Sequence, residues 1–316
     1  MTVFVTGGLG FIGSNFVISH LKKYASDTVV VLDNHSYAAN GSNLNGYWED
    51  YRLEVKHCDI RNLGVLENLY EDYKPSHTFH FAAESHVDNS IRGDDVFVDT
   101  NIGGTHNIIK CIRKHRSRLV HISTDEVYGS LTHEDPPFTE NTPYNPRNPY
   151  SATKAASDHL VRAYINTHNI DAIVTNCSNN YGPRQHHEKF IPTIIRNIQN
   201  NTPVPVYGSG MNVRDWLYVE DHCEALLTIK ENWKTGERYN IGGGVEMSNL
   251  DMVTLILDVM GKPVHMYQSW INFVNDRKGH DFRYAMDASK IYKELGWSAK
   301  TKLAEGLEKT LEWYNA

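Results

Sequence analysis

Two adjacent carboxylates, Asp125 and Glu126, are the side chains best suited to acid–base chemistry in this chain. They follow Thr124 and an apolar run at residues 119–122, which predicts a buried parallel strand. Ligands bind at the carboxyl ends of strands in an open α/β sheet, and carboxylates are costly to bury unless chemistry uses them. We therefore predict that one group acts as an acid and the other as a base. The alternative is a pair of loop carboxylates in water.

Tyr150 and Lys154 form a second pair with chemical potential. They are four residues apart, so they share one face of a helix that we expect at residues 150–166. An ammonium beside a phenol should lower the pKa of the phenol from its usual value of about 10 and make it a base near neutral pH. The spacing alone is common by chance, and it gains weight only behind a dinucleotide-binding fold.

The N-terminal segment predicts such a fold. A β-rich run at residues 2–6 leads into Gly7, Gly10 and Gly13, and helical periodicity begins at residues 14–24. Glycines at this spacing permit a tight turn, close approach of backbone to a pyrophosphate, and packing of helix on strand. The free N–H groups at the start of the helix then face the phosphates.

The following strands extend this prediction. A strand at residues 28–32 ends in Asp33, which suits the ribose hydroxyls of NAD and would repel the extra phosphate of NADP. The alternative role of Asp33 is that of a turn former. Asp59, at another strand end, could accept a hydrogen bond from the adenine amino group, and the small side chains of Ala82 and Ala83 would let a cofactor lie against backbone.

This alternation of strands and helices predicts an α/β fold, a Rossmann-type doubly wound parallel sheet with a smaller, interleaved α/β substrate-binding domain. We assign residues 1–176, with a returning segment at about 215–242, to the NAD-binding domain. Residues 177–214 and 243–316 would form the second domain, to which the family resemblance described below assigns nucleotide-sugar binding.

Composition excludes several classes of function. The net charge of -7 and the lack of a long basic run argue against nucleic acid or an anionic membrane as a partner. No apolar stretch is long enough to span a bilayer, and the 4 cysteines have no metal-ligand spacing. We expect a cytoplasmic protein with reduced thiols and no metal.

Together these motifs resemble the nucleotide-sugar 4,6-dehydratases of the extended short-chain dehydrogenase/reductase superfamily. The resemblance covers nearly the whole chain, including residues 82–88, 176–183, 214–219 and 276–281. The adjacent acids are its most specific part, because the sugar epimerases of the superfamily lack them. The resemblance favours dTDP-glucose as the substrate. UDP-glucose 4,6-dehydration and epimerisation remain alternatives, since the sequence does not reveal the base reliably.

The resemblance also implies roles for the candidate residues. Tyr150, assisted by Lys154, would take the proton of the 4-hydroxyl while hydride passes from carbon 4 to NAD. Thr124 would bond to the same oxygen. Glu126 would remove the proton of carbon 5, and Asp125 would protonate the departing 6-hydroxyl. Hydride would then return to carbon 6, so NAD should stay bound between turnovers.

Binding residues follow from the same resemblance. The implied cofactor contacts are Gly7, Gly10, Phe11, Ile12, Gly13, Asp33, Asn34, Asp59, Ile60, Ala82, Ala83, Ser85, Thr100, Tyr150, Lys154 and Asn180. The implied substrate contacts are Ser85, Thr124, Asp125, Glu126, Asn179, Lys189, Phe190, Pro205, Tyr207, Arg214, Asn249, Arg277 and His280.

Some of these assignments have a physical basis beside the resemblance. Arg214 and Arg277 suit a diphosphate because a guanidinium binds phosphate oxygens in pairs, and Tyr207 offers a stacking face to the base. The alternative for Arg214 is an ion pair with Asp215 or Glu220.

Residues 184–187 depart from the Tyr-His-Phe-Pro usual in the family. We interpret His186 and His187 as a solvated loop rather than a metal site, because adjacent histidines should diverge. The resemblance further implies a homodimer built from helices at residues 96–115 and 150–166.

Overall fold

The computed structural model describes residues 1–315. Its centre is a seven-stranded sheet in the order β10-β6-β5-β4-β1-β2-β3, in which every pair of neighbours is parallel. The predicted Rossmann-type doubly wound sheet is therefore confirmed. The strands are β1 (Thr2–Thr6), β2 (Thr28–Asp33), β3 (Leu53–His57), β4 (His77–His80), β5 (Arg118–Thr124), β6 (Ala172–Cys177) and β10 (Arg238–Ile241).

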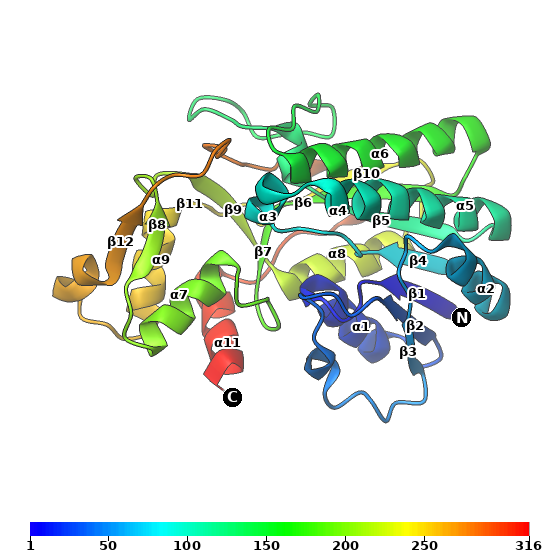
Figure 1. Cartoon of the computed structure of the whole chain (residues 1–316), viewed down its shortest axis with the longest axis horizontal. Coiled ribbons are helices and arrows are strands. Elements are labelled where there is room, and N and C mark those ends of the chain that lie inside the picture. The colour runs from blue at the N-terminus through cyan, green and yellow to red at the C-terminus, as the bar shows by residue number, and fades with distance from the viewer. Residues whose placement is uncertain (316) are drawn as a thin grey trace.

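Helices cover both faces of this sheet, as Figure 1 shows. One apolar core lies between the sheet and α1, α8 and α10, and a second lies on the opposite face under α2, α5 and α6. Burial on both faces explains why the central strands are nearly continuous runs of apolar residues. The helices are α1 (Phe11–Lys23), α8 (Val219–Glu231), α10 (Ser289–Leu295), α2 (Leu63–Tyr73), α5 (Thr105–His115) and α6 (Pro149–His168).

The start of α6 is strongly specified. Asn148 caps the helix by accepting a hydrogen bond from Ser151 N, Ser151 accepts one from Asn148 N in return, and Pro149 occupies the first turn. The preceding segment, residues 133–148, contains no helix and only one isolated bridge, as its prolines predict. The cap fixes where the helix begins and therefore where Tyr150 lies.

The helix predicted at residues 96–115 is interrupted. The chain is helical throughout, but it passes from α4 (Asp95–Phe97) through the π-helical segment η2 (Val98–Gly104) before α5 begins. Wide turns of this kind are common at functional sites. The segment presents Thr100 to the cofactor pocket described below. Periodicity alone does not distinguish a π-helical turn from an α-helical one, so this turn could not be predicted from the sequence.

A second lobe lies beside the first (Figure 1). It contains the strand pair β12-β8 and an apolar core of its own, and the three-stranded sheet β11-β9-β7 adjoins both lobes. The elements are β7 (Asn179–Tyr181), β8 (Val204–Tyr207), β9 (Val213–Tyr218), β11 (Glu246–Ser248), β12 (Ile271–Val274), α7 (Phe190–Gln199), α9 (Asn249–Val259), α11 (Leu303–Asn315) and η4 (Val264–Trp270). Three short elements lie near the site: η1 (Gly41–Leu44), α3 (Val87–Arg92) and η3 (Asp125–Tyr128). The predicted boundaries at residues 176, 214 and 242 stay a prediction.

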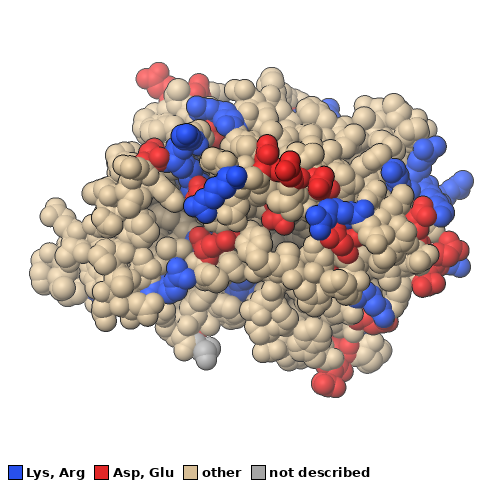
Figure 2. Space-filling model, viewed as in Figure 1, with Lys and Arg blue, Asp and Glu red and all other residues tan. Residues whose placement is uncertain are grey.

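The surface carries charges of both signs. Acidic and basic side chains are interspersed on the face drawn in Figure 2, and the net charge is -7. Across residues 1–315, none of the helices has the length and apolarity needed to pass through a lipid bilayer.

Candidate active site

Two adjoining pockets open at the carboxyl ends of the central strands. The first is lined by the glycine turn after β1, the ends of β2 and β5, and the start of α6. The second extends into the smaller lobe. The two pockets share several lining residues, so they form one continuous cleft. The shared residues are Ser85, Glu126, Asn179, Asn180, Gln185, Glu188 and Lys189.

The glycine turn has the geometry that a pyrophosphate requires. Gly7 has a φ of +69°, and a side chain at Gly13 would come within 2.2 Å of the carbonyl oxygen of Gly7. Gly10 lies at the N-terminus of α1 without a capping side chain. The first N–H groups of α1 therefore remain free for an anion, beside Phe11 and Ile12, which line the pocket.

The remaining predicted cofactor residues line the first pocket, with one exception. Asp33 does so while its two oxygens accept hydrogen bonds from Leu9 N and His35 N. Asp59 lies outside the lining, and its carboxylate accepts a hydrogen bond from Arg61 Nη2 at 2.6 Å, which lowers the pKa of that group to about 2. The predicted adenine contact of Asp59 therefore stays a prediction. The others in the lining are Asn34, Ile60, Ala82, Ala83, Ser85, Thr100, Tyr150, Lys154 and Asn180.

The acid pair lies at the tip of β5, in η3. Asp125 is 2% exposed, and its Oδ1 accepts a hydrogen bond from Thr124 Oγ1 at 3.2 Å. Burial and the neighbouring Glu126 raise the pKa of Asp125 well above its usual value. Glu126 is only partly buried and faces both pockets. Burial also raises its pKa, but Asn148 Nδ2 donates to Glu126 Oε2 at 3.3 Å and favours the carboxylate.

Tyr150 and Lys154 both line the first pocket, yet their electrostatics differ from the prediction. Burial raises the pKa of Tyr150 well above 10, and the nearby Glu126 adds to this increase. Lys154 does not offset it, because its Nζ donates to the carbonyl oxygen of Ile122 at 2.8 Å and burial lowers the pKa of the amine. The predicted lowering of the phenol pKa is therefore wrong.

The predicted substrate residues line the second pocket, except Thr124 and Asp125, which line the first. Arg214 donates to the carbonyl oxygens of Val213, Asp281 and Phe282, and its guanidinium lies 4.3 Å from the ring centre of Tyr284. The alternative predicted for Arg214 was an ion pair with Asp215 or Glu220, and no such ion pair forms among the residues that the structure describes. The others in the lining are Ser85, Glu126, Asn179, Lys189, Phe190, Pro205, Tyr207, Asn249, Arg277 and His280.

Two further cations face the second pocket. Arg277 lies 4.9 Å from the ring centre of Tyr207 and pairs with Asp88 at 3.5 Å, and Tyr207 donates to the same carboxylate. Lys189 Nζ donates to Ser85 O at 2.9 Å. This cluster could hold a diphosphate next to an aromatic face.

Sequence reasoning missed several residues of this pocket. Asn148, Trp216, Asp281 and Tyr284 are among them. The buried Asp281 accepts a hydrogen bond from Tyr284 OH at 2.6 Å. The only signal for Asn148 was its position before Pro149 and Tyr150, which is typical of a helix cap.

The departure at residues 184–187 produces a well-anchored loop. Arg184 adopts a φ of +72° and donates to Asn43 O and Asn15 Oδ1, which ties the loop to the first lobe. The rings of His186 and His187 lie 4.1 Å apart, so the expected divergence is wrong. Within residues 1–315, no three metal-ligating side chains lie close enough together to hold an ion.

Comparison with known proteins identifies the family. The model described as GDP-mannose 4,6 dehydratase matches residues 4–310. A dTDP-glucose 4,6-dehydratase from Salmonella typhimurium is 47% identical over 337 residues, covering 100% of this chain and 93% of the relative. The chain belongs to the dTDP-glucose 4,6-dehydratase family.

Solved structures of related proteins have a fold closely similar to that of this dTDP-glucose 4,6-dehydratase family member. A dTDP-glucose 4,6-dehydratase from Streptomyces venezuelae, solved with NAD and dTDP bound, is 43% identical with a TM-score of 0.94, covering 100% of this chain and 97% of that one. A UDP-glucose 4-epimerase from Thermotoga maritima has a TM-score of 0.91 but only 27% identity, covering 100% and 99%. The fold is thus common to both chemistries, and the higher identity favours the dehydratases.

Proposed function

We propose that this protein is an NAD-dependent hydro-lyase that converts dTDP-glucose to dTDP-4-keto-6-deoxyglucose. The observation that supports this most directly is the pair Asp125 and Glu126 at the tip of β5, beside Tyr150 and in the lining of the cleft. An epimerase has no need of two further acids. The relative from Salmonella typhimurium and the NAD-bound structure from Streptomyces venezuelae support the same substrate and cofactor.

The chemistry explains the need for both redox and acid–base groups. Water is hard to remove across carbons 5 and 6 of a hexose, because the hydrogen on carbon 5 is not acidic. A ketone at carbon 4 makes that hydrogen acidic. NAD, when bound, supplies this change by taking a hydride from carbon 4 and returning it to carbon 6. The accompanying protons must be moved by side chains of the protein.

The electrostatics of the site suggest how these tasks are divided. Tyr150 is the base for the 4-hydroxyl, and Thr124, next to Asp125, bonds to the same oxygen. Asp125 holds its proton because burial and Glu126 raise its pKa, so it can donate to the departing 6-hydroxyl. Glu126 receives a hydrogen bond from Asn148 that favours its ionised form, so it can accept the proton of carbon 5.

The second pocket fits a nucleoside diphosphate. Arg214, Arg277 and Lys189 bring positive charge to it, and Tyr207 offers a stacking face. In this arrangement the sugar would extend from the diphosphate toward Glu126, which lies where the two pockets meet.

A single assay tests this proposal. Purified protein should convert dTDP-glucose to a 4-keto-6-deoxy product without added NAD, because the cofactor is regenerated in each cycle. UDP-glucose should react more slowly. Formation of dTDP-galactose would mean an epimerase. If neither sugar gives a product even with NAD supplied, the protein keeps the fold of the family without its redox activity.

We also propose that the protein is a cytoplasmic homodimer. The 4 cysteines are free and buried, as expected in a reducing compartment.

Ile91, Val96 and Val98 expose at least 39% of their surface along α3, α4 and η2, which pack beside α6. Burial of these side chains between two subunits would stabilise a dimer. Sedimentation should give twice the mass of one chain, and Val98→Asp should shift the protein toward the monomer; a monomeric wild-type protein would contradict this.

A further inference from the structure

The helix that carries Tyr150 and Lys154 has a third ionisable residue on the same face. Asp158 follows Lys154 by four residues, just as Lys154 follows Tyr150, so the three side chains form one stripe along α6. Asp158 has no exposed surface and lies outside both pockets. The proposed reaction gives it no role, yet burying a carboxylate is costly unless its charge is compensated.

The carboxylate of Asp158 is compensated by hydrogen bonds from several elements. Its Oδ1 lies 3.1 Å from Nε2 of His121, on β5. Its Oδ2 accepts hydrogen bonds from Tyr144 OH at 2.7 Å and from Asn176 Nδ2 at 3.1 Å. These partners keep the pKa of Asp158 below its usual value in spite of its burial. Asp158 is therefore a fixed negative charge beneath the active site.

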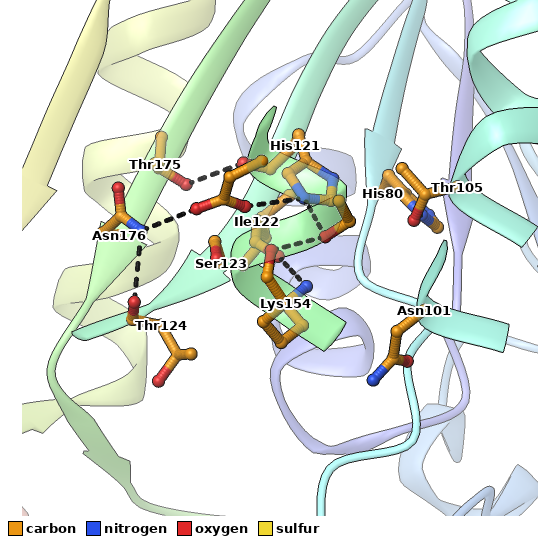
Figure 3. Close-up of polar contacts among 12 residues, drawn as sticks. His80, Asn101, Thr105, His121, Ile122, Ser123, Thr124, Lys154, Thr175 and Asn176 are labelled. Atoms are coloured by element: carbon orange, nitrogen blue, oxygen red, sulfur yellow. Dashed lines mark hydrogen bonds and ion pairs between the residues drawn. The ribbon is translucent and has the colours of Figure 1, made fainter. Parts of the chain in front are cut away.

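The same network reaches the reacting groups. Asn176 Nδ2 also donates to the carbonyl oxygen of Thr124 at 3.1 Å, so it connects the carboxylate to the tip of β5. Lys154 Nζ is held by the carbonyl oxygen of Ile122 on that strand. Figure 3 shows His121, Asn176, Thr124 and Lys154 gathered around this part of β5, with dashed lines for these contacts. The network thus contacts the backbone of Thr124 through Asn176, and His121 precedes Ile122, whose carbonyl oxygen binds Lys154.

We propose that Asp158 is a positioning residue for the oxidation step, whose buried negative charge keeps Lys154 in its ammonium form beside Tyr150. This inference rests on the proposed function, because it concerns the proton transfer that accompanies oxidation at carbon 4. The phenolate needs a neighbouring cation, and burial alone would drive Lys154 toward the neutral amine. Among the charges that act on Lys154, Asp158 has the largest effect that favours the ammonium.

Other titratable groups surround Lys154, and none duplicates this effect. His80 on β4 and His121 on β5 are buried, and burial lowers the pKa of both, so they are neutral. Burial raises the pKa of the Cys177 thiol on β6 to about 12, so it is protonated near neutral pH. The acid pair in η3 faces Tyr150 from the pocket side. Arg238 on β10 lies behind Tyr144, 5.2 Å from its ring centre, and stabilises the network from outside.

The test isolates oxidation from dehydration. dTDP-xylose has no carbon 6, so it can be oxidised at carbon 4 but cannot lose water, and reduced nicotinamide accumulates. We expect Asp158→Asn to move the descending limb of the pH–rate profile of this step down by about one pH unit. The limb moves because Lys154 loses its proton more easily without the neighbouring negative charge. Asparagine can keep the hydrogen bonds if His121 changes tautomer.

The matched control is Asp27→Asn. Asp27 is also a buried carboxylate, bonded to His20 and Lys230, but it precedes β2 at the amino ends of the strands, opposite the pockets. Both substitutions should reduce stability, and only Asp158→Asn should move the pH profile. An unchanged profile for Asp158→Asn would overturn the inference. Oxidation of dTDP-xylose by the unmodified protein is measured first, so failure of the proposed function is recognised separately.

A second measurement does not depend on the folding of Asp158→Asn. In NAD-loaded protein with ¹⁵N-labelled lysine, the signal of Lys154 can be assigned by its absence in Lys154→Arg. We expect an ammonium signal at neutral pH. A neutral amine at neutral pH would contradict the role assigned to Asp158.

Discussion

Glu126→Gln is expected to oxidise dTDP-glucose at carbon 4 and then stop. Glutamine has nearly the same shape and can still accept the hydrogen bond from Asn148, so the pocket should persist. It cannot take the proton of carbon 5. Loss of a general base typically costs about 10²–10⁴ in rate, and we expect a loss of that size in dehydration. The groups proposed for oxidation are untouched, so reduced nicotinamide should accumulate in a single turnover.

Two measurements distinguish this result from a general loss of activity. In heavy water, the unmodified protein should introduce deuterium at carbon 5, and Glu126→Gln should not. Glu305→Gln is a suitable control, because Glu305 lies on α11 and, among residues 1–315, forms an ion pair only with Lys309, one helical turn away. Product formation at the normal rate by Glu126→Gln would remove this residue from the mechanism.

Much of the site could be predicted because its residues lie at defined points of regular elements. The acid pair follows an unambiguous strand, and the glycines lie between a strand and a helix, which is the context that a phosphate-binding turn requires. Tyr150 and Lys154 are four residues apart on a helix with a strong cap. In each case local sequence determines both the element and the position of the side chain on it.

The remainder depends on contacts between distant segments. Tyr284 reaches the cleft from a segment without helix, far along the chain from the acid pair, and no pattern marks it. Asp281 ends a segment that matches the family, but the match alone did not place its side chain in the cleft. The direction of the pKa shift of Tyr150 could not be predicted either. Spacing indicated the lysine as its neighbour, but not that the carbonyl of Ile122 would hold that lysine or that burial would dominate.

Asp158 illustrates the same limit. Its spacing from Lys154 is visible in the sequence, but helices carry many acids at such spacing on exposed faces. Only the structure reveals that it is fully buried and that His121, Tyr144 and Asn176, which are far apart in the chain, converge on it.

Tyr150→Phe should block the reaction one step earlier than Glu126→Gln. The ring keeps its edge contact with Phe97, while the only group proposed to take the 4-hydroxyl proton is removed. Oxidation should fall by about 10²–10⁴, as for other general bases. Because the ketone never forms, neither reduced nicotinamide nor deuterium at carbon 5 should appear. Tyr128→Phe is the control, because this buried phenol bonds to Asn240 and lies outside both pockets.

The pH dependence of oxidation provides an independent check on Tyr150. The phenolate is the active form, so the rate should rise with pH as the phenol loses its proton. Burial raises the pKa of Tyr150, so this ascending limb of the pH–rate profile should lie above neutral pH unless a bound cation offsets the effect of burial. In Tyr150→Phe this ascending limb should disappear from the residual rate. If reduced nicotinamide still accumulates at the normal rate, and the limb persists, the proton must leave through another group. Lys154 would then be the base, and its ammonium form would be inhibitory rather than required.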